Sequence, residues 1–323
     1  MSLLFAVLAT AAASIPLPAD APISIDYLAV DLARGQIWVP ANNTGKTFVV
    51  DAAKGSIRTI DGFVTAEGKN GKRSGPTSAS VGDGVVYVGN RGDSSICAYD
   101  AVSLAKKGCA TVPSTPDGTV YVAPAHQVWV TTPREKSLQI LDVTAADAPK
   151  LIGKIELEGE PEGYAVDEKR GLFFTNLEDK DRTLAIDVKS HRVISDWAAG
   201  CGEAGPRGLA LDEERHFLFV ACTDAVLSLD ARTGKRLGRV ETGKGVDNID
   251  YLPARGLVYA AAGAAAQLTI AHVGKDGALT VEATVPLSKS TRVVVVTKDG
   301  DAFAADPAAG RLLHVRHPAK SPQ

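Results

Sequence analysis

Short apolar segments separated by polar turns recur along the whole chain. Residues 27–55, 163–191 and 208–234 are three clear examples. Each contains a short apolar strand, a turn with Gly or charges, a strand with an aromatic residue, a polar loop and a third strand that ends in Asp. No stretch of comparable length carries the helical period, so the pattern predicts β-structure throughout.

The repeat has a regular spacing, measured from the apolar residue late in each first strand. Seven units of four strands at about 40–45 residues are typical of a β-propeller. We therefore predict an all-β, seven-bladed propeller with four-stranded, WD40-like blades over residues 14–318, followed by a tail at 319–323. The seven positions are Val30, Val81, Val122, Val166, Leu211, Leu252 and Val296, separated by 51, 41, 44, 45, 41 and 44 residues.

The seventh unit lacks a strand at the carboxyl end. After Val296 only 27 residues remain, enough for two further strands. Residues 14–17 resemble the closing strands of other units, so we expect them to form the outer strand of blade seven. The N-terminal strand then closes the last blade and leaves no open sheet edge there.

Residues 1–13 are apolar and end in small residues, as a secretory signal peptide does, although the usual positive start is missing. An apolar first strand is the alternative. No other apolar run approaches the roughly 18 residues of a membrane span. These features favour a periplasmic or secreted protein without a membrane span.

Composition narrows the classes of function. The 323 residues are 45% apolar and 23% charged, with a formal net charge of −3. This balance is that of a folded globular protein and excludes a strongly basic nucleic-acid binder. We expect a monomer, and the 31 glycines fit the many tight turns of a propeller.

The four cysteines form no C-x-x-C pair, which argues against a zinc site. In the blade alignment Cys97 and Cys109 fall on neighbouring strands of blade two. Cys201 enters blade five and Cys222 ends its second strand. Two disulfides, 97–109 and 201–222, are therefore predicted, in keeping with an oxidising compartment. Four buried free thiols in a cytosolic protein are the alternative.

The loops that enter the first strands gather at one end of the central channel, and polar residues are predicted to line it there. Such convergent groups suit a small polar ligand or a cation, but a hydrated channel also needs polar lining, in which neighbouring Arg and carboxylate groups such as Arg292 and Asp26 neutralise each other. Four residues before each anchor lie Asp26, Thr77, Gly118, Glu162, Arg207, Asn248 and Arg292, and the ends of second strands add Asn90, Thr132, Asn176 and Asp306.

Catalytic and metal-binding chemistry is sparse in this sequence. Glu178, Asp179 and Asp181 could offer oxygens to Ca²⁺ or Mg²⁺, but Lys180 and Arg182 alternate with them and oppose a cation. No histidine is expected near the predicted ring, and no hydrolase, phosphate-binding or dinucleotide motif occurs. We therefore predict no catalytic residue and no cofactor, with Ca²⁺ or Mg²⁺ as the alternative.

The units "RGLALDEERHFLFVACTDAVLSLDARTGKRLGRVETG" and "DYLAVDLARGQIWVPANNTGKTFVVDAAKGSIRTI" resemble the YVTN/YncE-like β-propellers of bacteria. The shared features are a Pro-x-Gly entry, an Asp-containing turn, a "VYVAN"-like strand and a "VIDxxT"-like hairpin, and they cover residues 14–317. The resemblance implies an exported propeller that binds a small polar ligand, or an envelope protein for which it is a scaffold or structural partner. The architecture also resembles metal-dependent lactonases of the gluconolactonase and regucalcin type, which would place ligands at Glu162, Asn176, Asn248 and Asp306.

Overall fold

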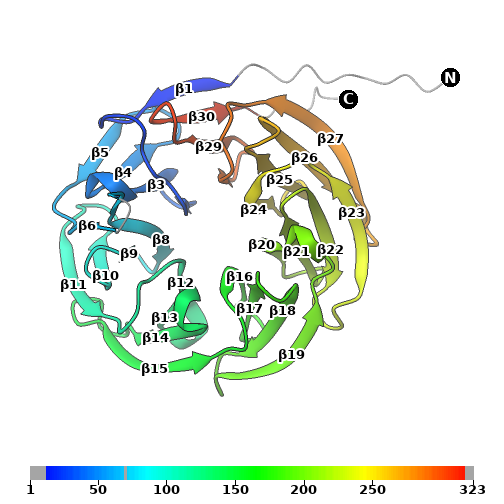
Figure 1. Cartoon of the computed structure of the whole chain (residues 1–323), viewed down its shortest axis with the longest axis horizontal. Helices are drawn as coiled ribbons and strands as arrows, with labels where there is room; N and C mark the ends of the chain where they lie inside the picture. The colour runs from blue at the N-terminus through cyan, green and yellow to red at the C-terminus, as the bar shows by residue number, and fades with distance from the viewer. Residues whose placement is uncertain (1–11, 69–70, 317–323) are drawn as a thin grey trace.

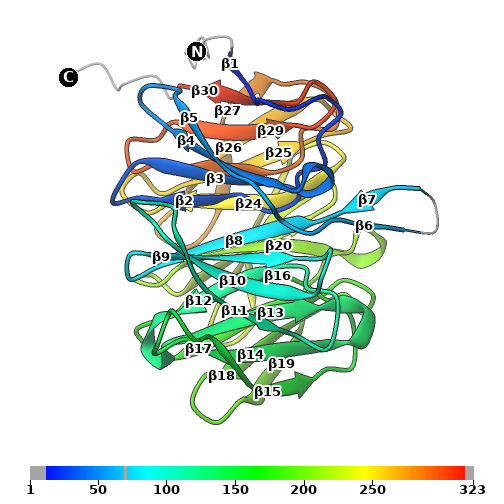
Figure 2. The ribbon, with the colours of Figure 1, turned by 90° about the vertical axis from the view of Figure 1, so that its left-hand side faces the viewer.

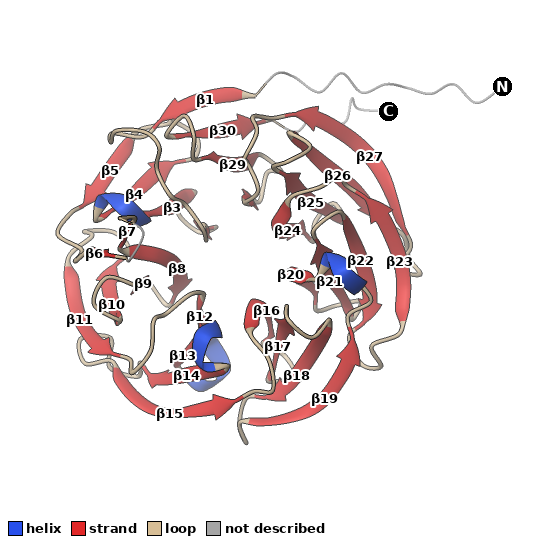
Figure 3. Cartoon of the chain, viewed as in Figure 1, coloured by secondary structure: helices blue, strands red, loops and turns tan. Residues whose placement is uncertain are grey.

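The computed structural model describes residues 12–68 and 71–316, and almost all of its regular structure is β-strand (Figure 3). Seven four-stranded antiparallel sheets surround a central channel (Figure 1). The predicted seven-bladed propeller is thereby confirmed.

The first four blades follow chain order from the channel outwards. Their strands are β2 (Ala29–Asp31), β3 (Gln36–Ala41), β4 (Lys46–Asp51) and β5 (Ile57–Ile60) in blade 1; β8 (Pro76–Gly82), β9 (Val85–Asn90), β10 (Ser95–Asp100) and β11 (Lys106–Thr111) in blade 2; β12 (Thr119–Val122), β13 (Gln127–Thr132), β14 (Ser137–Asp142) and β15 (Lys150–Glu156) in blade 3; and β16 (Pro161–Asp167), β17 (Leu172–Leu177), β18 (Arg182–Asp187) and β19 (Arg192–Ala198) in blade 4.

The remaining blades and short elements complete the ring. They are β20 (Pro206–Asp212), β21 (Phe217–Cys222), β22 (Ala225–Asp230) and β23 (Arg236–Glu241) in blade 5; β24 (Val246–Leu252), β25 (Leu257–Ala262), β26 (Gln267–Val273) and β27 (Leu279–Pro286) in blade 6; and β28 (Val294–Val296), β29 (Ala302–Asp306), β30 (Arg311–Val315) and β1 (Ala13–Pro16) in blade 7. Four 3₁₀ turns are η1 (Asn42–Thr44), η2 (Ala123–Ala125), η3 (Pro133–Glu135) and η4 (Gly202–Ala204), and a hairpin of β6 (Ala66–Glu67) and β7 (Arg73–Ser74) extends from one side of the disc (Figure 2).

The N-terminal strand closes the ring as the sequence predicted. β1 pairs antiparallel with β30, in a register that places Ile15 opposite Leu312 (Figure 1). Leu17, just beyond the strand, is buried in the apolar cluster between blades 7 and 1. Closure therefore ties the two ends of the chain by backbone pairing and by apolar packing. The predicted leader and C-terminal tail lie almost entirely outside the described residues.

Apolar packing between blades forms the core. Within the described residues, seven apolar clusters each join two neighbouring blades. The middle strands are covered on both faces, so β9 and β21 are buried along their whole length. The outermost strands, such as β15, alternate between exposed and covered positions, because solvent reaches their outer face.

A repeated Asp-x-x-Arg sequence shapes the turns after the first strands. Asp167, at the end of β16, accepts the backbone N–H of Arg170 at 3.0 Å and its guanidinium at 2.8 Å. Asp31 with Arg34 and Asp212 with Arg215 repeat both contacts. These turns stand at the end of the channel away from the loops that enter the first strands.

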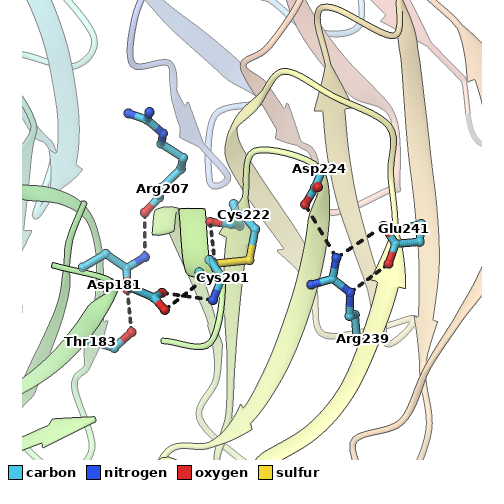
Figure 4. The surroundings of a disulfide bond; sticks show 11 residues. Asp181, Thr183, Cys201, Arg207, Cys222, Asp224, Arg239 and Glu241 are labelled. Atoms are coloured by element: carbon cyan, nitrogen blue, oxygen red, sulfur yellow. Dashed lines mark hydrogen bonds and ion pairs between the residues drawn. A yellow bond between two sulfur atoms is a disulfide. The ribbon is translucent and has the colours of Figure 1, made fainter. Parts of the chain in front are cut away.

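Both predicted disulfides are present. Cys97 and Cys109 lie directly opposite each other on β10 and β11. Cys201 and Cys222 join the entry to blade 5 to the end of its second strand, and Asp181 accepts the N–H of Cys201 at 3.0 Å (Figure 4). None of the helices in the described residues has the length and apolar character needed to cross a membrane. The two disulfides are compatible with an oxidising compartment.

Candidate functional site at the channel mouth

A chain of ion pairs surrounds the channel mouth, the end of the channel at which loops enter the first strands. Asp26 accepts from Arg91 at 2.8 Å and from Arg292 at 3.1 Å. Arg292 also contacts Asp247 at 3.1 Å, and Arg91 pairs with Asp117. Five side chains from the entries and loops of blades 1, 2, 3, 6 and 7 thus form one network. The predicted pair of Asp26 and Arg292 is part of it.

A second group of charges lies on blades 4 and 5. Arg207 pairs with Glu178, which follows β17, rather than with its neighbour Glu162. Glu162 accepts no hydrogen bond within the described part of the chain. Burial raises its pKa to about 8, and the nearby carboxylates of Asp247, Glu178 and Asp26 add to the shift, which Arg207 only partly opposes. Glu162 is therefore a carboxyl group without a dedicated partner.

The mouth holds more carboxylates than cations. Five acidic side chains, Asp26, Asp117, Glu162, Glu178 and Asp247, face three guanidiniums, those of Arg91, Arg207 and Arg292. Burial raises the pKa of Asp247 to about 6, although Arg292 acts in the opposite direction. Burial is the main cause of both shifts, and the neighbouring carboxylates add to it, so a cation in direct contact with either group would favour its ionised form.

A β-bulge at the start of three first strands positions these groups. In β24, Val246 pairs with Ala262 and Ile249 with Ala260, so Asp247 and Asn248 together stand opposite one residue. β16 and β20 shift register at the same place. Because of the extra residue, the side chains of two consecutive positions can both reach the mouth. In a regular strand, consecutive side chains point to opposite faces of the sheet, so one of the two would point away.

Two tyrosines meet across the channel below the mouth. The rings of Tyr27 and Tyr164 come from blades 1 and 4 and stack across the axis with centroids 5.8 Å apart. Tyr27 donates to Asp117 at 3.2 Å, and Tyr164 donates to the carbonyl of Thr119 at 3.0 Å. Gly118 makes this approach feasible, since a Cβ there would lie 2.2 Å from the Tyr164 ring. The tyrosine pair therefore narrows the channel below the mouth.

Three predicted ligand residues are used internally instead. Asn176 is fully buried; it donates to the carbonyl of Arg207 at 2.7 Å and accepts from Thr183 at 2.7 Å. Asn90 is 1% exposed and bonds Asp93 and the N–H of Gly92. These amides hold loops and neighbouring blades in place, and they lie beside the mouth rather than in it.

Asp306 is the third predicted ligand residue with an internal partner, whereas Asn248 lies at the mouth. Asp306 is 1% exposed and pairs with Arg311 at 2.8 Å, which removes it from the mouth. Asn248 is half-buried, and its side-chain amide reaches the carbonyl of Asp26 at 3.5 Å. Of the eight predicted ligand residues, Asp26, Glu162, Arg207, Asn248 and Arg292 are brought together at the mouth.

The carboxylates of the acidic loop after β17 do not converge on one site. Glu178 pairs with Arg207, Asp179 with Lys136 at 2.9 Å, and Asp181 accepts backbone N–H groups of the blade 5 entry. Over the described ranges, no group of three or more His, Cys, Asp or Glu residues is arranged to hold a metal ion.

Several residues of the mouth were missed by sequence reasoning. Asp117 and Asp247 each directly precede a predicted ring position, and a bulge at the entry would have indicated Asp247. Arg91 directly follows the predicted Asn90 and lies in the loop after β9. Nothing in the sequence indicates that Tyr27 and Tyr164 meet across the channel.

Comparisons with solved structures support the fold. The RRP9 WD40 repeats superpose with a TM-score of 0.76 at 12% identity, over 96% of this chain and 98% of that one. The WD40 propeller domain of Doa1 gives 0.71 at 13% identity, over 97% and 98%. Hydrazine synthase of Kuenenia stuttgartiensis gives 0.75 at 13%, over 93% and 97%. This chain is thus a seven-bladed β-propeller whose structural neighbours include WD40 propellers.

Similarity at this level of identity concerns the fold alone. No family model matches the sequence. No curated protein matches it either. The YVTN/YncE-like resemblance therefore rests on the repeat residues themselves.

Proposed function

We propose that this protein is an exported, non-enzymatic binding module whose channel mouth takes a small polar cation. The ligand would bear an ammonium or guanidinium group and enter between blades 1, 4 and 6. Support comes from the excess of carboxylates at the mouth and from the two disulfides, which suit the periplasm or the cell exterior.

The observation that carries this proposal is the state of Glu162. Every arginine of the mouth already has a carboxylate partner, whereas Glu162 has none among the described residues. A cation placed beside Glu162 would lower its pKa and gain a charge-assisted hydrogen bond. The tyrosine pair forms a floor that would keep such a ligand at the mouth.

A guanidinium–amine probe, agmatine, tests the proposal by titration calorimetry. We expect saturable binding to the wild-type protein and affinity at least tenfold weaker in Glu162→Gln, since one charged contact is lost. Glu156→Gln removes the same charge from an exposed side chain on the outer strand β15, outside the ion pairs of the mouth, and should bind normally. Equal affinity in all three proteins, or no binding at all, would overturn the proposal.

We further propose that the ligand is held without a resident metal and that the chain belongs with the YVTN/YncE-like propellers. The dispersal of carboxylates into separate ion pairs supports the first point, and the Pro-x-Gly entries at 161–163 and 206–208 support the second. Calorimetry with Ca²⁺, Mg²⁺ and Zn²⁺ should show no saturable heat. A lactonase would need such binding, lost on substitution of Glu162.

A further inference from the structure

The other end of the channel is built differently from the mouth. Below the tyrosine pair, between blades 1, 6 and 7, lies a cavity of about 520 Å³, which we name the far cavity. Its walls are mostly aliphatic, although a hydrated channel was expected to have a polar lining. The main wall residues are Leu28, Val30, Ile249, Leu252, Val294 and Val296.

The far cavity leaves apolar surface open to water. Leu32, on its rim, is 54% exposed, and Pro253 and Ala254 border the same opening. Water finds few hydrogen-bond partners in such an apolar space, so its replacement by an apolar group is favourable. Its volume falls within the range of about 300–1,000 Å³ that is usual for small-molecule sites.

Two charged side chains line this mostly aliphatic cavity: Lys298, which is exposed to solvent, and Asp250. Asp250 of β24 lines the cavity; its carboxylate accepts the N–H of Val296 at 2.7 Å and of Tyr251 at 2.8 Å. No ion pair to Asp250 forms within residues 12–68 and 71–316. Each carboxylate oxygen therefore keeps a lone pair for a further donor. Burial raises the pKa of Asp250 to about 6, so it is mostly ionised at neutral pH.

These features define one kind of ligand. An apolar molecule alone would leave the Asp250 charge uncompensated. A purely polar cation would leave the aliphatic wall in contact with water. We propose that the far cavity binds an amphipathic primary ammonium ion, with its apolar body against Val30 and Val294 and its N–H donors on Asp250. This site uses a different carboxylate from the proposed site at the channel mouth, although Asn248 borders both.

Calorimetry with 2-phenylethylammonium tests the proposal, with the neutral 2-phenylethanol as a matched probe of nearly the same shape. We expect the amine to bind at least tenfold more tightly than the alcohol, because only the amine meets Asp250 as a cation. In Asp250→Asn the affinity for the amine should fall at least tenfold, while that for the alcohol should change little.

A second variant covers the case in which Asp250→Asn does not fold. Val30→Phe adds bulk at a half-buried wall position and should abolish binding of both probes. Thermal melting confirms that it is folded, and Glu156→Gln again controls for net charge. The proposal is wrong if the alcohol binds as tightly as the amine, if Val30→Phe binds the amine normally, or if a folded Asp250→Asn does so.

Discussion

Single residues determine the backbone conformation of the turns and the charge of the channel mouth. Turns after the first strands need a left-handed backbone position, which is supplied by Gly171 at φ 63° but by His216 at φ 60° in the next blade. Glycine reaches this conformation without a steric cost because it has no Cβ, whereas other residues, such as His216, adopt it with strain. At the mouth, by contrast, Glu162 is held in a position that disfavours its own charge.

Gly171→Ala isolates the backbone effect, because an added Cβ at this position meets no atom within 4 Å. We expect a loss of about 1–2 kcal/mol in the free energy of unfolding, measured by urea denaturation. Gly153→Ala on β15 is the matched control, since its Cβ also meets nothing and its φ is not left-handed. It should be neutral or slightly stabilising; equal losses in both variants would contradict this explanation.

Glu162→Gln should change stability in a manner that depends on pH. The folded pKa of about 8 lies above the ordinary value of 4.5, so the folded state holds this proton more tightly than the unfolded state. The wild-type protein therefore loses stability as pH rises between these two values. Melting curves should show the variant several degrees more stable near pH 9 and equal to the wild type near pH 4; the same difference at both would refute the assignment.

Closure of the propeller is decided at the level of the strand. β1 contributes little apolar surface of its own, but Leu17 behind it joins the cluster that seals blades 7 and 1. The first and last blades also share packed apolar faces, the ion pair between Arg292 and Asp26, and the hydrogen bond from the N–H of Ile23 to the carbonyl of Pro307. The strand β1 adds backbone pairing to these contacts and so strengthens the closure.

Leu17→Ala should cost about 2–5 kcal/mol, as is usual for truncation of a buried leucine. The change is measurable as a lower midpoint in urea. Val281→Ala on the outer strand β27 removes apolar atoms from a side chain that is 51% exposed and should stay within about 0.5 kcal/mol of the wild type. A small effect of Leu17→Ala would mean that closure depends on the backbone ladder alone.

At the scale of the whole molecule, spacing predicted the blades, their closure and both disulfides, because each follows from the position of a residue within a repeated unit. The mouth was only partly predictable. Asp26, Glu162 and Arg292 occupy equivalent repeat positions, whereas Arg91 reaches in from a loop. Asn176 has the right position in the repeat, but its hydrogen bonds to a neighbouring blade remove it from the site.

The charge balance of the channel mouth differs most between the sequence-based prediction and the structure. Equivalent positions alone give two carboxylates and two guanidiniums, which would neutralise each other. Asp117, Glu178 and Asp247 join through bulges and loops, and only Arg91 offsets them. Contacts across the channel, such as Tyr27 with Tyr164, join blades that are far apart in sequence and follow only from the closed ring.

The central claim is that an uncompensated carboxyl at the channel mouth recognises a cation. Its most direct test is the affinity for agmatine between about pH 6 and pH 9, a range over which the guanidinium of the probe keeps its charge and Glu162 ionises. Binding to the wild-type protein should tighten about tenfold across this range, and binding to Glu162→Gln should change far less. An affinity that is independent of pH in the wild type, or an equal change in both proteins, would contradict the claim.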